Sequence, residues 1–237
     1  MPHSTFQNET QRVDAVYTKR GYDDDSNYND FNPVYLHRVH SMERAMLAAL
    51  RSVGLHQHLD DLKVLDFGCG NGKWLGRWMA WGAVGANLVG VDLRSKCIEL
   101  ATSRLSPCCF KTMADGNIPF DDASFGVVAQ NVVFSSILDN HLRHSAAAEM
   151  QRVLKPGGYI LWCDFIFSNP SNANVRAVTK EDIRSLFPTF KEVMMRKIIL
   201  APPIARRLVP ISWLAVDLVE ACFPFLRTHV VALLQKS

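Results

Sequence analysis

The sequence predicts an α/β fold whose central sheet is mostly parallel. Seven short runs of apolar residues are typical of buried strands, and helical patterns with apolar residues three or four positions apart separate most of them. Strands that alternate with helices form βαβ units, and the crossover helices cover both faces of the sheet. A chain of 237 residues is long enough for one such domain with a well-buried core.

The elements can be placed in order along the chain. Residues 1–33 are polar and are expected to form an arm with a loop at residues 23–25, and a helix follows over residues 34–53. The predicted strands are residues 63–67, 87–92, 109–113, 125–130, 159–163, 191–200 and 227–234. The predicted helices between them are residues 73–81, 95–105, 144–154 and 180–187.

Composition and charge exclude several classes of protein. With 48% hydrophobic and 21% charged residues the chain is typical of a globular protein, and a formal charge of +3 is too small to indicate a nucleic-acid partner. The six cysteines lack the paired spacings of a zinc site, so no metal is predicted. The start of the chain has no signal-peptide pattern. Free thiols then indicate a reducing compartment, and we expect the cytoplasm.

One long apolar stretch lies near the end of the chain, at residues 208–226. Asp217, Glu220 and two prolines interrupt it, whereas a membrane-spanning helix needs about 20 predominantly apolar residues. The stretch therefore predicts a buried helix or a lid and not an integral membrane segment. Because aromatic and basic residues flank it, peripheral membrane association is the alternative interpretation.

The strongest motif lies where the first strand meets its helix. Gly68, Gly70 and Gly72 allow backbone N–H groups to approach a ligand closely, beside the positive end of a helix dipole. The third glycine comes one residue earlier than in the G-x-G-x-x-G dinucleotide motif. Asp92 lies twenty residues after Gly72 at the end of the second strand, where a carboxylate can accept both ribose hydroxyls of a nucleoside. The pattern predicts a nucleoside-containing ligand.

Four stretches together resemble the class I S-adenosylmethionine-dependent methyltransferases, and most closely the ubiquinone-biosynthesis-like small-molecule subgroup. They are VLDFGCGNG at 64–72, GVDL at 90–93, ADGNIPFDDASF at 114–125 and EMQRVLKPGG at 149–158. The resemblance covers residues 62–165 in the family's order. It implies a three-layer, Rossmann-like sandwich with a seven-stranded, mostly parallel sheet and an antiparallel last strand. It also implies that S-adenosylmethionine is the cofactor.

The resemblance assigns roles to individual residues. The cofactor-binding residues it implies are Asp66, Gly68, Cys69, Gly70, Gly72, Asp92, Leu93, Ala114, Asp115, Gly116, Gln130 and Asn131. Among them Asp92 would hold the ribose and Asp115 the adenine amino group, while Asp66 is either structural or orders the methionine end. We expect Tyr17, Arg20 and Tyr28 of the N-terminal arm to cover the cofactor as a lid that excludes water.

Two departures from the family's pattern concern the acceptor side. Gly126 stands where the family often has Asp, and the stretch that begins at Phe134 stands where many members have His. We expect Phe134 to contact the substrate. A hydroxyl acceptor needs a base, and the candidates are Asp164, just past the fifth strand, and His229, in the last strand. A phosphate or carboxylate acceptor would need none.

Residues 201–226 join the last two strands and are too long for a plain turn. By the family's topology they emerge on the ligand side, where Arg206, Arg207 and Arg227 are expected to hold an anionic acceptor. We therefore divide the chain into a covering arm and helix (1–60), a cofactor-binding core (61–200), and a lid with the final strand (201–237).

The function that follows is methyl transfer to oxygen or nitrogen of a small metabolite, with a sugar or glycan end as one interpretation. A protein or RNA methyltransferase and a non-catalytic S-adenosylmethionine-binding module are the alternatives.

Overall fold

The computed structural model describes residues 3–19, 29–168 and 172–237. The strands are β1 (Val64–Phe67), β2 (Leu88–Asp92), β3 (Cys109–Thr112), β4 (Phe125–Asn131), β5 (Leu154–Phe165), β6 (Lys191–Leu200) and β7 (Arg227–Gln235). The helices are α1 (His3–Lys19), α2 (Pro33–Ser52), α3 (Lys73–Ala80), α4 (Ser95–Arg104), α5 (Asn140–Val153), α6 (Lys180–Leu186), α7 (Pro202–Leu208) and α8 (Trp213–Cys222). Four short 3₁₀ turns are η1 (Leu55–Gln57), η2 (Gly85–Asn87), η3 (Phe134–Ser136) and η4 (Pro224–Leu226).

The strands form one seven-stranded sheet in the order β3-β2-β1-β4-β5-β7-β6. The first five pair in parallel, and β7 runs antiparallel to both β5 and β6. The predicted three-layer, Rossmann-like fold with an antiparallel last strand is confirmed. The order reverses at β1 and β4, whose carboxyl ends therefore mark the usual ligand position of such sheets.

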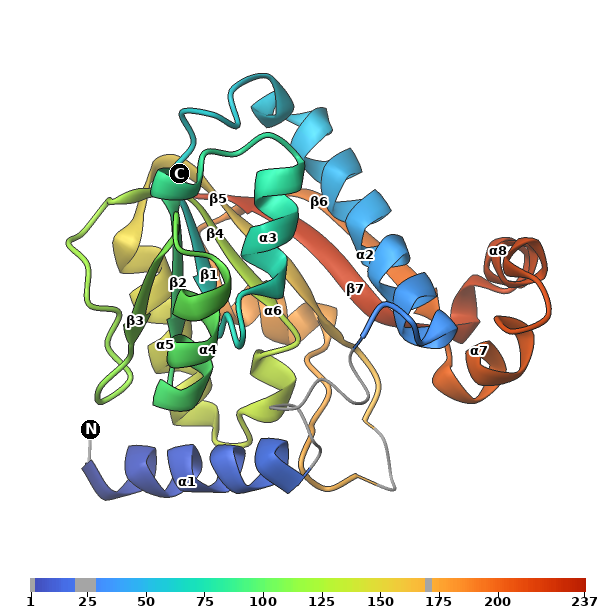
Figure 1. The fold of residues 1–237 in the computed structure, drawn as a ribbon, viewed down its shortest axis with the longest axis horizontal. Coiled ribbons are helices and arrows are strands. Elements are labelled where there is room, and N and C mark those ends of the chain that lie inside the picture. The colour runs from blue at the N-terminus through green and yellow to red at the C-terminus, as the bar shows by residue number, and fades with distance from the viewer. Residues whose placement is uncertain (1–2, 20–28, 169–171) are drawn as a thin grey trace.

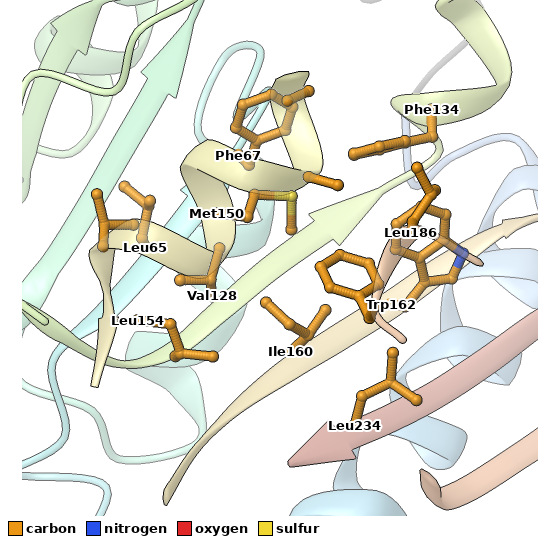
Figure 2. Packing of buried hydrophobic residues seen from close by; sticks show 14 of the residues in the cluster. Leu65, Phe67, Val128, Phe134, Met150, Leu154, Ile160, Trp162, Leu186 and Leu234 are labelled. Atoms are coloured by element: carbon orange, nitrogen blue, oxygen red, sulfur yellow. The ribbon is translucent and has the colours of Figure 1, made fainter. Parts of the chain in front are cut away.

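Helices cover both faces of the sheet (Figure 1). Because successive strand residues point to opposite faces, neighbouring residues enter different cores. Helices α5 and α6 cover one face, and Figure 2 shows its apolar core, which includes Leu65, Phe67, Phe134, Met150, Ile160, Trp162, Leu186 and Leu234. Helices α2 and α3 cover the other face, where the buried side chains include Met46, Val64, Leu75, Trp78, Leu161 and Leu233.

Residues 3–19 of the N-terminal arm form helix α1. The helix crosses the ligand-side edge of the sheet, below the strands in Figure 1. Its sequence has few apolar residues, and its pattern alone did not indicate a helix; ion pairs and hydrogen bonds to the loops beneath replace an apolar stripe. Helix α5 begins at Asn140, earlier than predicted, since Asp139 caps it by accepting from the Leu142 N–H.

The segment between β6 and β7 forms α7, α8 and η4 and projects from one end of the molecule (Figure 1). Its small apolar core of Leu200, Ala205, Val209 and Val216 is separate from the two cores of the sheet. Within the described residues no helix has the length and apolar character needed to cross a membrane.

Candidate functional site

A pocket of about 1250 Å³ lies at the carboxyl ends of the parallel strands. Its walls come from the glycine-rich loop, α1, α2, the loops after β2 and β4, the end of β5, the start of α7 and the start of β7. Pockets for one small ligand usually hold about 300–1,000 Å³. The volume therefore fits a cofactor and an acceptor side by side.

The glycine-rich loop is shaped by backbone conformations that other residues avoid. Gly68 and Gly70 have φ angles of 71° and 53°, in the left-handed region that favours glycine. A Cβ atom on Gly68 would lie 2.5 Å from a methyl group of Val133. Gly68, Cys69 and Gly70 line the pocket, whereas Gly72 lies behind it and begins α3. The loop thus presents its backbone to the cavity.

Asp92 ties this loop to β2. One carboxylate oxygen accepts from the Gly70 N–H at 2.9 Å, and the other accepts from the Arg94 N–H at 2.9 Å. Burial raises the pKa of Asp92, and the N–H groups of Arg94 and Gly70 oppose that rise. Because each carboxylate oxygen has two lone pairs, Asp92 can accept two further hydroxyl donors from within the pocket. Leu93 lines the pocket beside it.

Asp66 is a buried carboxyl group in β1. Its side chain is 1% exposed, and its Oδ2 atom has no hydrogen-bond partner. Burial raises its pKa to about 7, an interaction with the Asn131 side chain opposes this, and the charge of Asp92 adds to it. Asn131 itself lines the pocket. Asp66 itself does not line the pocket.

Gln130 does not line the pocket but fixes the loop that does. Its amide nitrogen donates to the Cys163 carbonyl at 3.2 Å, and its amide oxygen accepts from the Val133 N–H at 3.0 Å. Gln130, for which a cofactor contact is predicted, thus has both ends of its side chain engaged in protein contacts and positions the loop.

The loop after β3 forms the far end of the predicted cofactor site. Gly116 lines the pocket with a φ angle of 79°, and a Cβ atom there would lie 3.0 Å from the Phe6 ring of α1. Ala114 and Asp115 are exposed and do not line it. Asp115 has a φ angle of 56°, so the turn places Gly116, and not Asp115, against the cavity.

Helix α1 closes one side of the pocket through polar contacts. The Tyr17 hydroxyl lies 2.9 Å from the Ser136 hydroxyl, and Glu9 accepts from the Leu138 N–H at 3.0 Å. Asp14 pairs with the buried Arg94 guanidinium at 2.8 Å. Tyr17 thus lies in the pocket wall, while Arg20 and Tyr28 lie outside the described residues.

His229 lines the opposite end of the pocket. It is 1% exposed, its Nε2 atom has no partner, and its ring centroid lies 3.9 Å from that of Phe165. Its Nδ1 atom lies 3.0 Å from the Thr228 hydroxyl. Burial, followed by the charge of Arg38, lowers the pKa of His229 to about 3, so the imidazole is neutral at neutral pH.

Asp164 lies on the other face of the sheet. In the β5–β7 register Phe165 is opposite His229 and Asp164 is opposite Val230, which points into the α5–α6 core. Its carboxylate accepts from the Ser135 and Phe165 N–H groups at 3.0 and 2.8 Å. Burial raises its pKa to about 6. Asp164 does not line the pocket, so the geometry favours a structural role over the predicted role as a base.

Of the predicted acceptor residues, too, only some line the pocket. Arg206 lines the pocket and is exposed, whereas Arg207 is exposed and does not line it. Arg227 is half-buried and donates to the Lys197 carbonyl at 3.4 Å. Phe134 is fully buried, its ring centroid lies 4.5 Å from that of Trp162, and it does not line the pocket. Figure 2 shows both side chains in the same apolar core. The ring of Phe134, for which a substrate contact is predicted, belongs to the core.

Several pocket residues were absent from the sequence prediction. Helix α2 was predicted only as a helix, yet Asn32, Tyr35, His37 and Arg38 at its start line the acceptor end. His37 and Ser41 are buried and four residues apart. That spacing of polar residues on the apolar face of a helix was the one available signal. Among the described residues no cluster of His, Cys, Asp and Glu has the geometry of a metal site.

Comparison with known proteins places this site in a family. Residues 65–162 match a family model described as a methyltransferase domain. Over this region the chain is similar to the class I S-adenosylmethionine-dependent methyltransferases. The family's cofactor is S-adenosylmethionine, and the glycine-rich loop and the remaining acceptor positions of Asp92 fit a nucleoside.

Two curated relatives match part of the chain. A malonyl-[acyl-carrier protein] O-methyltransferase of Erwinia billingiae is 33% identical over 42% of this chain and 38% of its own length. A chloroplastic 2-phytyl-1,4-beta-naphthoquinone methyltransferase of Arabidopsis thaliana is 33% identical over 46% of this chain and 43% of its own length. The match therefore spans less than half of either relative.

Solved structures show the same fold. An S-adenosylmethionine-dependent methyltransferase of Methanosarcina mazei aligns with a TM-score of 0.56 at 19% identity, over 75% of this chain and 93% of that one. A putative sarcosine dimethylglycine methyltransferase of Galdieria sulphuraria aligns with a TM-score of 0.57 at 13% identity, over 82% and 86%. At these identities the likeness concerns the fold alone.

Proposed function

We propose that this chain transfers the methyl group of S-adenosylmethionine to a hydroxyl or amino group of a small amphiphilic molecule. The observation that carries the proposal is one continuous pocket of about 1250 Å³ that runs from the glycine-rich loop to His229. In this proposal the loop, Asp92, Asn131 and Tyr17 surround the cofactor, and the end near His229 and α7 receives the acceptor.

The lining of the acceptor end supports an amphiphilic molecule over a sugar or glycan end. Its walls include Phe165, Phe167, Leu200 and Pro202, which suit apolar groups better than a polyhydroxylated ring. Arg206 lies exposed in the same wall and can bind an anionic or polar end. The acceptor of this proposal therefore has an apolar body with polar ends.

His229 is our proposed base for a hydroxyl acceptor. The Thr228 hydroxyl donates its one hydrogen to the Ile199 carbonyl at 3.3 Å, so it can only accept from His229. This assigns the proton of the neutral imidazole to Nδ1 and leaves a lone pair on Nε2, the atom without a partner.

When bound, S-adenosylmethionine supplies an electrophilic methyl group on a positively charged sulfur. With a hydroxyl acceptor, His229 Nε2 would accept the hydroxyl proton, which becomes strongly acidic as the acceptor oxygen is methylated. Even a base of low pKa accepts such a proton, and the remaining task of the pocket is alignment.

The test is a turnover assay that follows S-adenosylhomocysteine with alkylphenols, hydroxylated amphiphiles and simple sugars as acceptors. We expect turnover with the amphiphiles, and about a hundredfold lower kcat for His229→Gln, with unchanged affinity for S-adenosylhomocysteine. The matched control is Asp164→Asn, which removes the other predicted base and should retain the wild-type pH profile. Turnover with sugars alone would contradict the acceptor class, and binding without turnover of any acceptor would indicate a non-catalytic module.

A further inference from the structure

Helix α8 has its polar and apolar sides inverted for a surface helix. Its two acidic side chains face the protein: Glu220 is buried and accepts from the Leu200 N–H at 2.7 Å, and Asp217 pairs with Arg44 at 3.1 Å. Its exposed positions carry apolar residues, among them Leu214 at 69% and Leu218 at 56% exposure. A surface helix normally turns its charged face outward.

The helix belongs to a larger exposed apolar surface, which we call the α8 patch. It comprises Ile211, Trp213, Leu214, Leu218, Phe223 and Phe225. These are six of the ten large apolar side chains that are exposed in the described part of the chain. Large exposed apolar surfaces mark interaction sites, whereas single exposed apolar residues do not.

The charge around the α8 patch indicates whether a second copy of the chain or an anionic surface binds there. Arg206 and Arg207 lie exposed on α7, next to the patch, and form no ion pair with any residue that the structure describes. Since Asp217 is paired and Glu220 is buried, the surface around the patch is positively charged. A twofold interface centred on the patch would hold the arginines of both copies, while Asp217 is already paired and Glu220 is buried, so the contact would carry uncompensated positive charge. An anionic surface would attract the arginines.

The patch also adjoins the proposed active site. Pro202, Pro203, Ala205 and Arg206 of α7 line the pocket, and α7 packs on α8 through Val209 and Val216. Figure 1 shows α7 and α8 projecting together from the body of the molecule. A projecting apolar helix with flanking arginines suits insertion into the headgroup region of a bilayer.

We propose that the α8 patch docks on membranes that contain anionic lipids and brings the pocket close to the bilayer. The inference rests on the proposed function in one respect, because it adds that the amphiphilic acceptor is taken from the membrane. Apolar burial supplies the affinity, and Arg206 and Arg207 select the anionic surface.

The test is co-sedimentation of the full chain with vesicles of phosphatidylcholine alone and of phosphatidylcholine with phosphatidylglycerol. We expect binding to the anionic vesicles, weaker binding to the neutral ones, and a decrease at high salt. The double variant Leu214→Gln with Leu218→Gln should bind at least about tenfold more weakly. Glutamine preserves helix propensity, and neither leucine lines the pocket. Val84→Gln, an exposed apolar residue outside the patch, is the matched control and should bind as the wild type does.

Three outcomes would overturn the docking proposal: no binding of the wild type to anionic vesicles, equal binding of the double variant, or a dimer that the double variant dissociates without vesicle binding. Affinity for S-adenosylhomocysteine is measured on the same preparations. If the wild type does not bind S-adenosylhomocysteine, the proposed function is contradicted. If the wild type binds S-adenosylhomocysteine but not vesicles, the docking proposal alone is contradicted.

Discussion

Burial controls the protonation of the ionisable residues at the site. Asp66 and His229 are each 1% exposed, and burial opposes the charged form of both. It raises the pKa of the carboxyl group to about 7 and lowers that of the imidazole to about 3. Around neutral pH the site thus holds a neutral imidazole and a carboxyl group close to its midpoint. A bound cation near Asp66 would favour the carboxylate.

The variant Asp66→Asn should change how the free energy of unfolding depends on pH. Because the pKa of Asp66 is raised in the folded state, its contribution to stability is fully present below its unfolded value of 3.8 and is lost as the pH rises to about 7. The free energy of unfolding of the wild type should therefore fall relative to that of Asp66→Asn across this range, by a few kcal/mol. Urea unfolding at several pH values measures it.

The control for that experiment is Asp61→Asn, which changes an exposed carboxylate three residues before the start of β1. It should follow the wild type across the same pH range. A difference between the wild type and Asp66→Asn that stays constant with pH would show that Asp66 has the same pKa in the folded and unfolded states.

Individual site residues could be predicted from the sequence only in part. The motif located Gly68, Gly70, Asp92 and Asn131, which all line the pocket. The motif could not show that Asp164 lies outside the pocket, because one step along a strand moves a side chain to the other face of the sheet. That choice depends on the register between β5 and β7, which pairs residues far apart in the chain.

The positions of the strands and helices were predicted better than what these elements do at the site. All seven strands lie near their predicted positions, and most of them contain a continuous apolar run. The bounds of helix α1 were not predicted, because its sequence has no apolar periodicity. Polar contacts such as the Asp14–Arg94 ion pair stabilise the helix instead. Residues 201–226 were recognised as too long for a turn, and tertiary packing on Val34 and Leu200 determines where their helices lie.

Helix α7 gives a prediction at the scale of the element. Arg206 and Arg207 are neighbours with the same charge, but only Arg206 lines the pocket. With an anionic acceptor in solution, Arg206→Ala should raise KM about tenfold, the scale of a charge-assisted hydrogen bond, while Arg207→Ala should leave KM near the wild-type value. Steady-state kinetics on the two single variants measures this. Equal effects would indicate long-range charge attraction and not a contact.

The whole molecule combines a family core with elements added around it. The sheet edge supplies the glycine-rich loop and Asp92, as in the family that residues 65–162 match. Helices α1 and α2 and the β6–α7 segment enclose that edge and give the pocket its size. The identity of the cofactor therefore follows from the core, while the acceptor depends on the surrounding elements.

The central claim is that the pocket binds S-adenosylmethionine through the loop and Asp92, and calorimetric titration with S-adenosylhomocysteine tests it most directly. We predict one site of micromolar-range affinity in the wild type and no binding of NAD. Asp92→Ala should weaken the affinity about 10- to 100-fold, because it removes charge-assisted acceptors for the ribose and releases the Gly70 and Arg94 N–H groups. No binding of S-adenosylhomocysteine to the wild type, or an unchanged affinity in Asp92→Ala, would contradict the account.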